Sequence, residues 1–92
     1  MTLTLANEQS ITVKNVTNRI ESSEDKITLN VYLTGKTFDE LVDIFTPEAI
    51  ASMQLYRDDT LLVTYTGYEL SNINTYISDD DYNSNVEFTK AL

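Results

Sequence analysis

The sequence predicts an α+β fold, a mainly antiparallel β-sheet in the order β-β-β-α-β-β-β-β with one short helix packed on one face. Apolar and polar residues alternate from Lys26 to Thr34, which is typical of a strand with one buried face. Apolar residues recur at helical spacing from Phe38 to Phe45 instead. A chain of 92 residues is long enough for one hydrophobic core, so we expect a single domain over residues 1–92.

Shorter alternating runs predict the strands before this central one. Leu3 and Leu5 alternate with threonines, Ile11 and Val13 alternate with polar residues, and the polar stretch 6–10 between them indicates a hairpin loop. The segment Asn18–Asp25 has little pattern, and we expect it to be a polar connector.

The helical segment begins with a capping-box pattern, in which Thr37 and Glu40 can satisfy each other's backbone N–H groups. Thr46-Pro47 then predicts a short second turn of helix towards Ser52. The predicted core combines the helix face with inward strand positions: Leu29, Val31, Leu33, Phe38, Leu41, Val42, Phe45, Leu55, Val63 and Phe88.

Four strands follow the helix, and we expect them to form a meander. Met53–Arg57 and Thr60–Thr66 flank Asp58-Asp59, a candidate tight turn. The apolar parity changes between Leu70 and Ile73, which predicts a β-bulge near Ser71-Asn72. Val86 to Leu92 alternate in a final strand.

The absence of histidine and cysteine narrows the function more than any residue that is present. Without them the chain cannot form a Ser–His or Cys–His pair, a disulfide, or the usual structural zinc site. A net charge of −9 disfavours binding to nucleic-acid phosphates and to anionic membranes. The first residues do not resemble a signal peptide, and no apolar run approaches the roughly 20 residues of a membrane span. We therefore expect a protein that is not an enzyme and needs no cofactor.

Two acidic features of the sequence are candidate chemical sites. Asp79, Asp81, Asn83 and Asn85 alternate like the ligands of an EF-hand loop, but serine replaces its glycine and Lys90 replaces its final glutamate. We interpret the segment as a solvated hairpin loop and expect no specific divalent-metal site. The carboxylate pairs Asp58–Asp59 and Asp39–Asp43 fall in a turn and on an exposed helix face, where they lack the burial that acid–base catalysis by a carboxyl group needs.

Tyrosines on outward strand positions are the stronger candidates for function. Tyr32 and Tyr56 alternate with apolar residues and are expected to face outwards, beside threonine and asparagine. Tyrosine is enriched at protein interfaces, although it also favours exposed strand positions without any partner. We expect an interaction surface centred on these two residues.

A resemblance to a known group of proteins rests on two segments. Thr37-Phe38-Asp39-Glu40-Leu41 leading to Phe45, and Tyr65-Thr66-Gly67-Tyr68-Glu69-Leu70 before a closing strand, make the chain similar to small uncharacterised proteins of phages and prophages of Gram-positive bacteria. Genes of that group tend to lie near tail and other structural genes. The resemblance implies a virion-associated or accessory phage protein, located in the bacterial cytoplasm or the virion, and no catalytic residues.

Two functions from different classes follow. The first is a structural or assembly module that binds copies of itself or a phage structural protein, with a homo-oligomer as its simplest form. The alternative is an acidic DNA mimic that inhibits a host defence nuclease. A mimic needs carboxylates spaced like phosphates, whereas the acids here cluster in predicted loops and on the helix.

Overall fold

The strands form one seven-stranded antiparallel sheet in the order β5-β4-β1-β2-β3-β7-β6. A computed structural model describes residues 1–32, 38–78 and 81–92, except for the side chains at 32, 38, 39, 77, 78, 81 and 82. The elements are β1 (Thr2–Thr4), β2 (Ser10–Glu21), β3 (Glu24–Tyr32), α1 (Phe38–Ile44), α2 (Pro47–Ile50), β4 (Ser52–Arg57), β5 (Thr60–Thr66), β6 (Glu69–Ser78) and β7 (Asp81–Ala91). The β-rich α+β prediction is confirmed, with two short helices in place of one.

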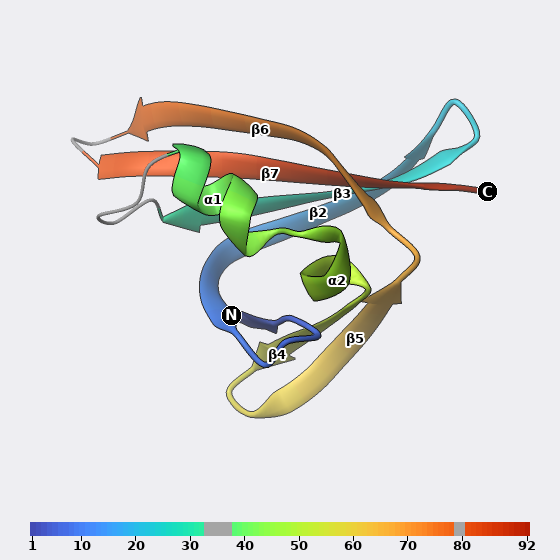
Figure 1. Ribbon diagram of the computed structural model, residues 1–92, viewed down its shortest axis with the longest axis horizontal. Coiled ribbons are helices and arrows are strands. Elements are labelled where there is room, and N and C mark those ends of the chain that lie inside the picture. The colour runs from blue at the N-terminus through green and yellow to red at the C-terminus, as the bar shows by residue number, and fades with distance from the viewer. Residues whose placement is uncertain (33–37, 79–80) are drawn as a thin grey trace.

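Strand β2 joins the two halves of the sheet. Its first residues pair with β1, and the rest pairs with β3 after a bulge at Lys14 that separates the pairs Val13–Val31 and Asn15–Asn30. A bulge bends its strand and increases the local twist. The sheet therefore curves at β2, and the helices lie inside the curve (Figure 1).

The second helix begins where the sequence predicts. Thr46 is the N-cap residue, and its Oγ1 accepts a hydrogen bond from the Ala49 N–H at 3.3 Å, while Pro47 occupies the first turn. Helix α2 contacts β4 and β6, which belong to opposite halves of the sheet. Thr37 of the predicted capping box lies outside the described residues.

The core lies between the helices and the inner face of the curved sheet. Six of the predicted core residues are buried: Leu29, Val31, Leu41, Phe45, Leu55 and Phe88. Val63 is partly buried, Leu33 lies outside the described residues, and the side chain of Phe38 is not described. Val42 is 40% exposed, so its prediction is wrong. Leu41 and Phe45, four residues apart, face the core, whereas Val42 is turned about 100° away from Leu41 around the axis.

One turn and one bulge agree with the sequence. Asp58 and Asp59 both have positive φ, 48° and 66°, and join β4 to β5 in a two-residue hairpin, as predicted. Strand β6 carries its extra residue at Ser71, because Leu70 pairs with Phe88 and Asn72 with Glu87. The bulge predicted near Ser71-Asn72 is confirmed.

Three local predictions are wrong. Asn18–Asp25 is not a connector, because β2 continues to Glu21 and turns through Ser22-Ser23 into β3. The last strand begins at Asp81, so Asn83 and Asn85 belong to β7 and not to a solvated loop. The last four strands do not form a meander, because β4 pairs with β1, β7 pairs with β3, and β5 and β6 lie at opposite edges.

Candidate interaction surface

Tyr56 lies on the outward face of β4, next to the sheet edge. It alternates with buried Met53 and Leu55, and it pairs with Thr2 on one side and Leu61 on the other. Its side chain is half-buried, and its hydroxyl donates to Gln54 Oε1 at 3.1 Å. This hydrogen bond holds the ring along its own strand, so the aromatic surface is ordered before any partner binds.

Tyr32 ends β3, where its backbone pairs with Asn83 of β7. Its side chain is not described, so its predicted outward direction stays a prediction. Tyr32 follows Val31, which pairs with Val13 on β2. The preceding residue of β2, Thr12, pairs with Thr2 on β1, and Thr2 pairs with Tyr56 on β4. Strands β1 and β2 therefore lie between Tyr32 and Tyr56 in the sheet. A surface that includes both would span most of the sheet.

A row of asparagines crosses the outward face of the other half of the sheet. Asn15, Asn30, Asn85 and Asn74 stand opposite one another on β2, β3, β7 and β6. Asn30 is buried, and its amide donates to Asn85 Oδ1 at 2.8 Å and to the Tyr76 hydroxyl. The bonds among Asn30, Asn85 and Tyr76 stiffen the centre of the row, whereas Asn15 and Asn74 are exposed.

Two further polar residues are buried at the start of β7. The Lys14 ammonium donates to Asn83 Oδ1 at 3.0 Å, so the side chain of the bulged residue of β2 reaches over β3 to β7. Ser84, on the opposite face of the strand, donates to the backbone carbonyl of Asn74 at 3.2 Å. The signal in the sequence was the alternation of asparagines at 83 and 85, which is also a strand pattern.

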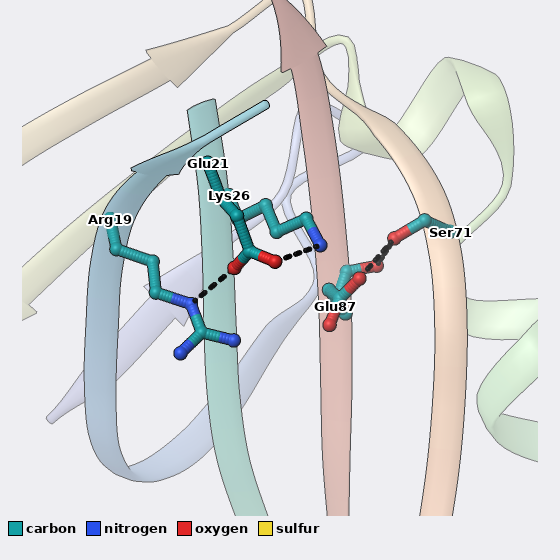
Figure 2. Close-up of polar contacts among 5 residues, drawn as sticks. All are labelled: Arg19, Glu21, Lys26, Ser71 and Glu87. Atoms are coloured by element: carbon teal, nitrogen blue, oxygen red, sulfur yellow. Dashed lines mark hydrogen bonds and ion pairs between the residues drawn. The ribbon is translucent and has the colours of Figure 1, made fainter. Parts of the chain in front are cut away.

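Charged side chains gather at the far end of this face, near the β2–β3 hairpin (Figure 2). The Glu21 carboxylate lies 3.3 Å from Arg19 Nε and 3.8 Å from Lys26 Nζ. On strands β6 and β7, the Ser71 hydroxyl donates a hydrogen bond to the Glu87 carboxylate at 3.1 Å. The face therefore contains cations between its carboxylates, which a surface that imitates a row of phosphates would not contain.

Strand β5 forms one edge of the sheet and exposes two adjacent leucines. Thr60–Thr66 contains no charged residue, and within the described part of the chain β5 pairs with β4 only. Tyr56 pairs with Leu61 and Leu55 with Val63, so Leu62 is the extra residue of a bulge. Leu61 and Leu62 are each 47% exposed. We call the neighbouring side chains of Tyr56, Leu61 and Leu62 the β4–β5 surface. The sequence pointed to its tyrosine and missed the leucines, because successive residues of a regular strand face opposite sides and the sequence does not show the bulge at Leu62.

A buried tyrosine cluster lies where β5 leads into β6. The rings of Tyr65 and Tyr68 meet edge to face with centroids 5.8 Å apart, and the Tyr68 hydroxyl donates to Asp25 Oδ2. Burial, the hydrogen bond to Asp25 and the charge of Asp25 raise the pKa of Tyr68 to about 12. Burial and Asp25 also raise the pKa of Tyr65. Both hydroxyls stay protonated at neutral pH, so this cluster supplies no tyrosinate base or nucleophile.

The acidic candidates whose side chains are described lie on two separate elements. Asp58 and Asp59 form the exposed β4–β5 turn, and Asp43 is exposed on α1. Asp79 lies outside the described residues, and the side chains of Asp39 and Asp81 are not described. Within residues 1–32, 38–78 and 81–92, no three carboxylates are grouped so that they could hold a metal ion.

Comparison of the chain with protein-family models, with curated proteins and with solved structures gives no significant match. None of the described helices is long and apolar enough to cross a membrane.

Proposed function

We propose that this chain is a non-enzymatic protein-binding module that associates with a second copy of itself through the β4–β5 surface. The observation that carries this proposal is the uncharged edge strand β5 with its two exposed leucines beside Tyr56. Edge strands of monomeric proteins usually carry charges that prevent pairing with other chains. Strand β5 carries none.

The lack of charge on this surface suits a second copy of the same acidic chain. Two chains of charge −9 repel each other, so they can meet closely only where charge is absent. Strand β5 has no charged residue, so its antiparallel pairing with a second β5 would bring no like charges face to face. Such a two-fold contact uses the same surface on both copies and closes as a dimer.

Strand β6, the other edge, also has an uncharged stretch from Leu70 to Ser78, but the large exposed apolar side chains in the described residues do not include any from β6. The bulge at Leu62 interrupts the hydrogen-bonding edge of β5, so backbone pairing is regular over Val63–Thr66 only. The leucine side chains must therefore supply much of the contact, which makes them the residues to change.

The double variant Leu61→Lys/Leu62→Lys is expected to convert a dimer into a monomer, because it places four like charges at the contact between two copies. Light scattering after size-exclusion chromatography measures the mass directly. Ile20→Lys is the matched control, since Ile20 is 70% exposed at the distant β2–β3 hairpin and its variant should stay dimeric. Circular dichroism should show the same strand content in all three proteins. A monomeric wild type at micromolar concentration would overturn the proposal.

The origin of the protein stays a prediction from its resemblance to phage and prophage proteins, as do a phage structural partner and a place in the host cytoplasm or the virion. The DNA-mimic alternative predicts a monomer that inhibits a nuclease and is displaced by DNA. The cations Arg19 and Lys26 on the sheet face argue against the DNA-mimic alternative.

A further inference from the structure

A cleft of about 540 Å³ opens between the two helices and the start of β6. Ligand-binding pockets usually have volumes of about 300–1,000 Å³ and mostly apolar walls. A smaller hollow of about 260 Å³ continues along β6 as far as Ile73 and shares Val42 and Leu70 with the cleft. We call the two hollows together the helix–β6 groove; its apolar wall consists of Val42, Phe45, Pro47, Ile50, Leu70 and Ile73.

Carboxylates stand at the rim of this apolar groove. Asp43 on α1 and Glu69 on β6 are exposed and line the cleft from opposite sides. Among the described residues neither carboxylate has an ion-pair partner. The segment Phe38–Ala51 contains four acids and no lysine or arginine. Lys90 is near, but it lies against the Tyr68 ring, 5.5 Å from the centroid. The groove therefore favours a ligand with an apolar centre and positive ends.

The groove also runs beside a free strand edge. Among the described residues, strand β6 pairs with β7 on one side only, and its other edge is the end of the sheet. An extended peptide can hydrogen-bond to such an edge while one of its side chains enters a neighbouring pocket. A small molecule would not need this edge. A second copy of the chain, with charge −9, would be repelled by Asp43 and Glu69.

We propose that the helix–β6 groove binds an extended basic segment of a partner protein, with one large apolar side chain in the cleft and flanking lysines or arginines beside Asp43 and Glu69. This site is separate from the β4–β5 surface, because the two surfaces share no residue. The chain would thus associate with itself through one edge of its sheet and bind a second protein at the other.

The probe is the labelled peptide Lys-Thr-Phe-Thr-Lys, and its binding is measured by fluorescence polarisation. Two matched peptides separate the contribution of the apolar side chain from that of the charges: Lys-Thr-Ala-Thr-Lys lacks the apolar anchor, and Glu-Thr-Phe-Thr-Glu reverses the charge. We expect saturable binding of the first peptide, with each change weakening it about tenfold or more. Added salt should weaken the binding further, because the rim charges are exposed.

The double variant Asp43→Lys/Glu69→Lys should reverse the preference, so that the glutamate peptide binds better than the lysine peptide. Both positions are exposed, so the fold should tolerate the change. Glu21→Lys/Glu24→Lys is the control, because it makes the same charge change at the β2–β3 hairpin, away from the groove. That control should keep the original preference, and so should the monomeric Leu61→Lys/Leu62→Lys variant.

Three results would overturn the proposal: no saturable binding, equal binding of the phenylalanine and alanine peptides, or an unchanged preference in Asp43→Lys/Glu69→Lys. The second would show that net charge alone attracts the peptide. None of these results bears on dimerisation, which is measured by mass.

Discussion

Replacing Phe45 by alanine is expected to lower the free energy of unfolding by about 3–5 kcal/mol. Phe45 directly follows α1, is 2% exposed, and packs edge to face against Phe88 of β7 with ring centroids 5.4 Å apart. The variant removes the transfer energy of a whole ring and leaves a cavity between the helices and the sheet. It also loses the aromatic pair, which contributes about 0.5–1.5 kcal/mol beyond the buried area.

Urea unfolding followed by circular dichroism measures this change. Val42→Ala is the matched control on the same helix, because Val42 is 40% exposed and its truncation should lower the free energy of unfolding by less than about 1 kcal/mol. Phe45→Leu should lie between the two, since leucine refills part of the cavity. An unchanged urea midpoint for Phe45→Ala would show that this helix face is not part of the core.

The parts of the fold that could be predicted are those where one face of a strand is buried. Residues 26–32 alternate because Ile27, Leu29 and Val31 enter the core, and this pattern identified β3. The β4–β5 hairpin was found because aspartates tolerate the left-handed backbone of its turn. The bulge at Ser71 was found because one extra residue changes the parity of the apolar side chains.

Prediction failed where the burial pattern disappears. The second half of β2 extends beyond the core, and residues from Thr17 to Glu21 are exposed on both faces, so they show no alternation. The prediction of the start of β7 failed for the opposite reason, because Asn83 and Ser84 are polar and yet buried. Their hydrogen-bond partners, Lys14 and Asn74, come from other strands, and a single sequence does not show which strands will be neighbours.

The strand order and the candidate site could not be predicted in full for the same reason, because the sequence does not show which strands are neighbours. A chain passing from β5 to β6 across Gly67 looks like a hairpin in the sequence, but the two strands lie at opposite edges of a curved sheet. The groove lies between the helices and the start of β6, and the contact between α2 and β6 cannot be read from the sequence. Tyr56 was identified as an outward tyrosine from its parity. The exposure of Leu61 and Leu62 depends on the β5 edge and its bulge, which the sequence does not show.

Raising the pH above 10 is expected to destabilise the protein through Tyr68. The pKa of Tyr68 is raised from 10.0 to about 12, because burial, the hydrogen bond to Asp25 and the Asp25 charge all disfavour the tyrosinate. Between these two values the unfolded chain releases the Tyr68 proton while the folded chain keeps it. The unfolded state then binds fewer protons, so the free energy of unfolding falls as the pH rises. The contribution is fully present below pH 10 and is lost as the pH rises through about 12.

The decrease from this one residue should be on the order of 1–2 kcal/mol by pH 12, and Tyr65, whose pKa is also raised, adds to it in the same direction. Urea midpoints at a series of pH values from neutral to alkaline measure the effect, with tyrosinate absorbance as an independent record of ionisation. Tyr68→Phe is the decisive comparison. It leaves Asp25 without its hydroxyl donor and should be less stable than the wild type at neutral pH. Its stability should then fall less steeply above pH 10, because the phenylalanine has no proton to release. Equal slopes in the two proteins would show that the Tyr68 hydroxyl is not held beside Asp25 in the folded state.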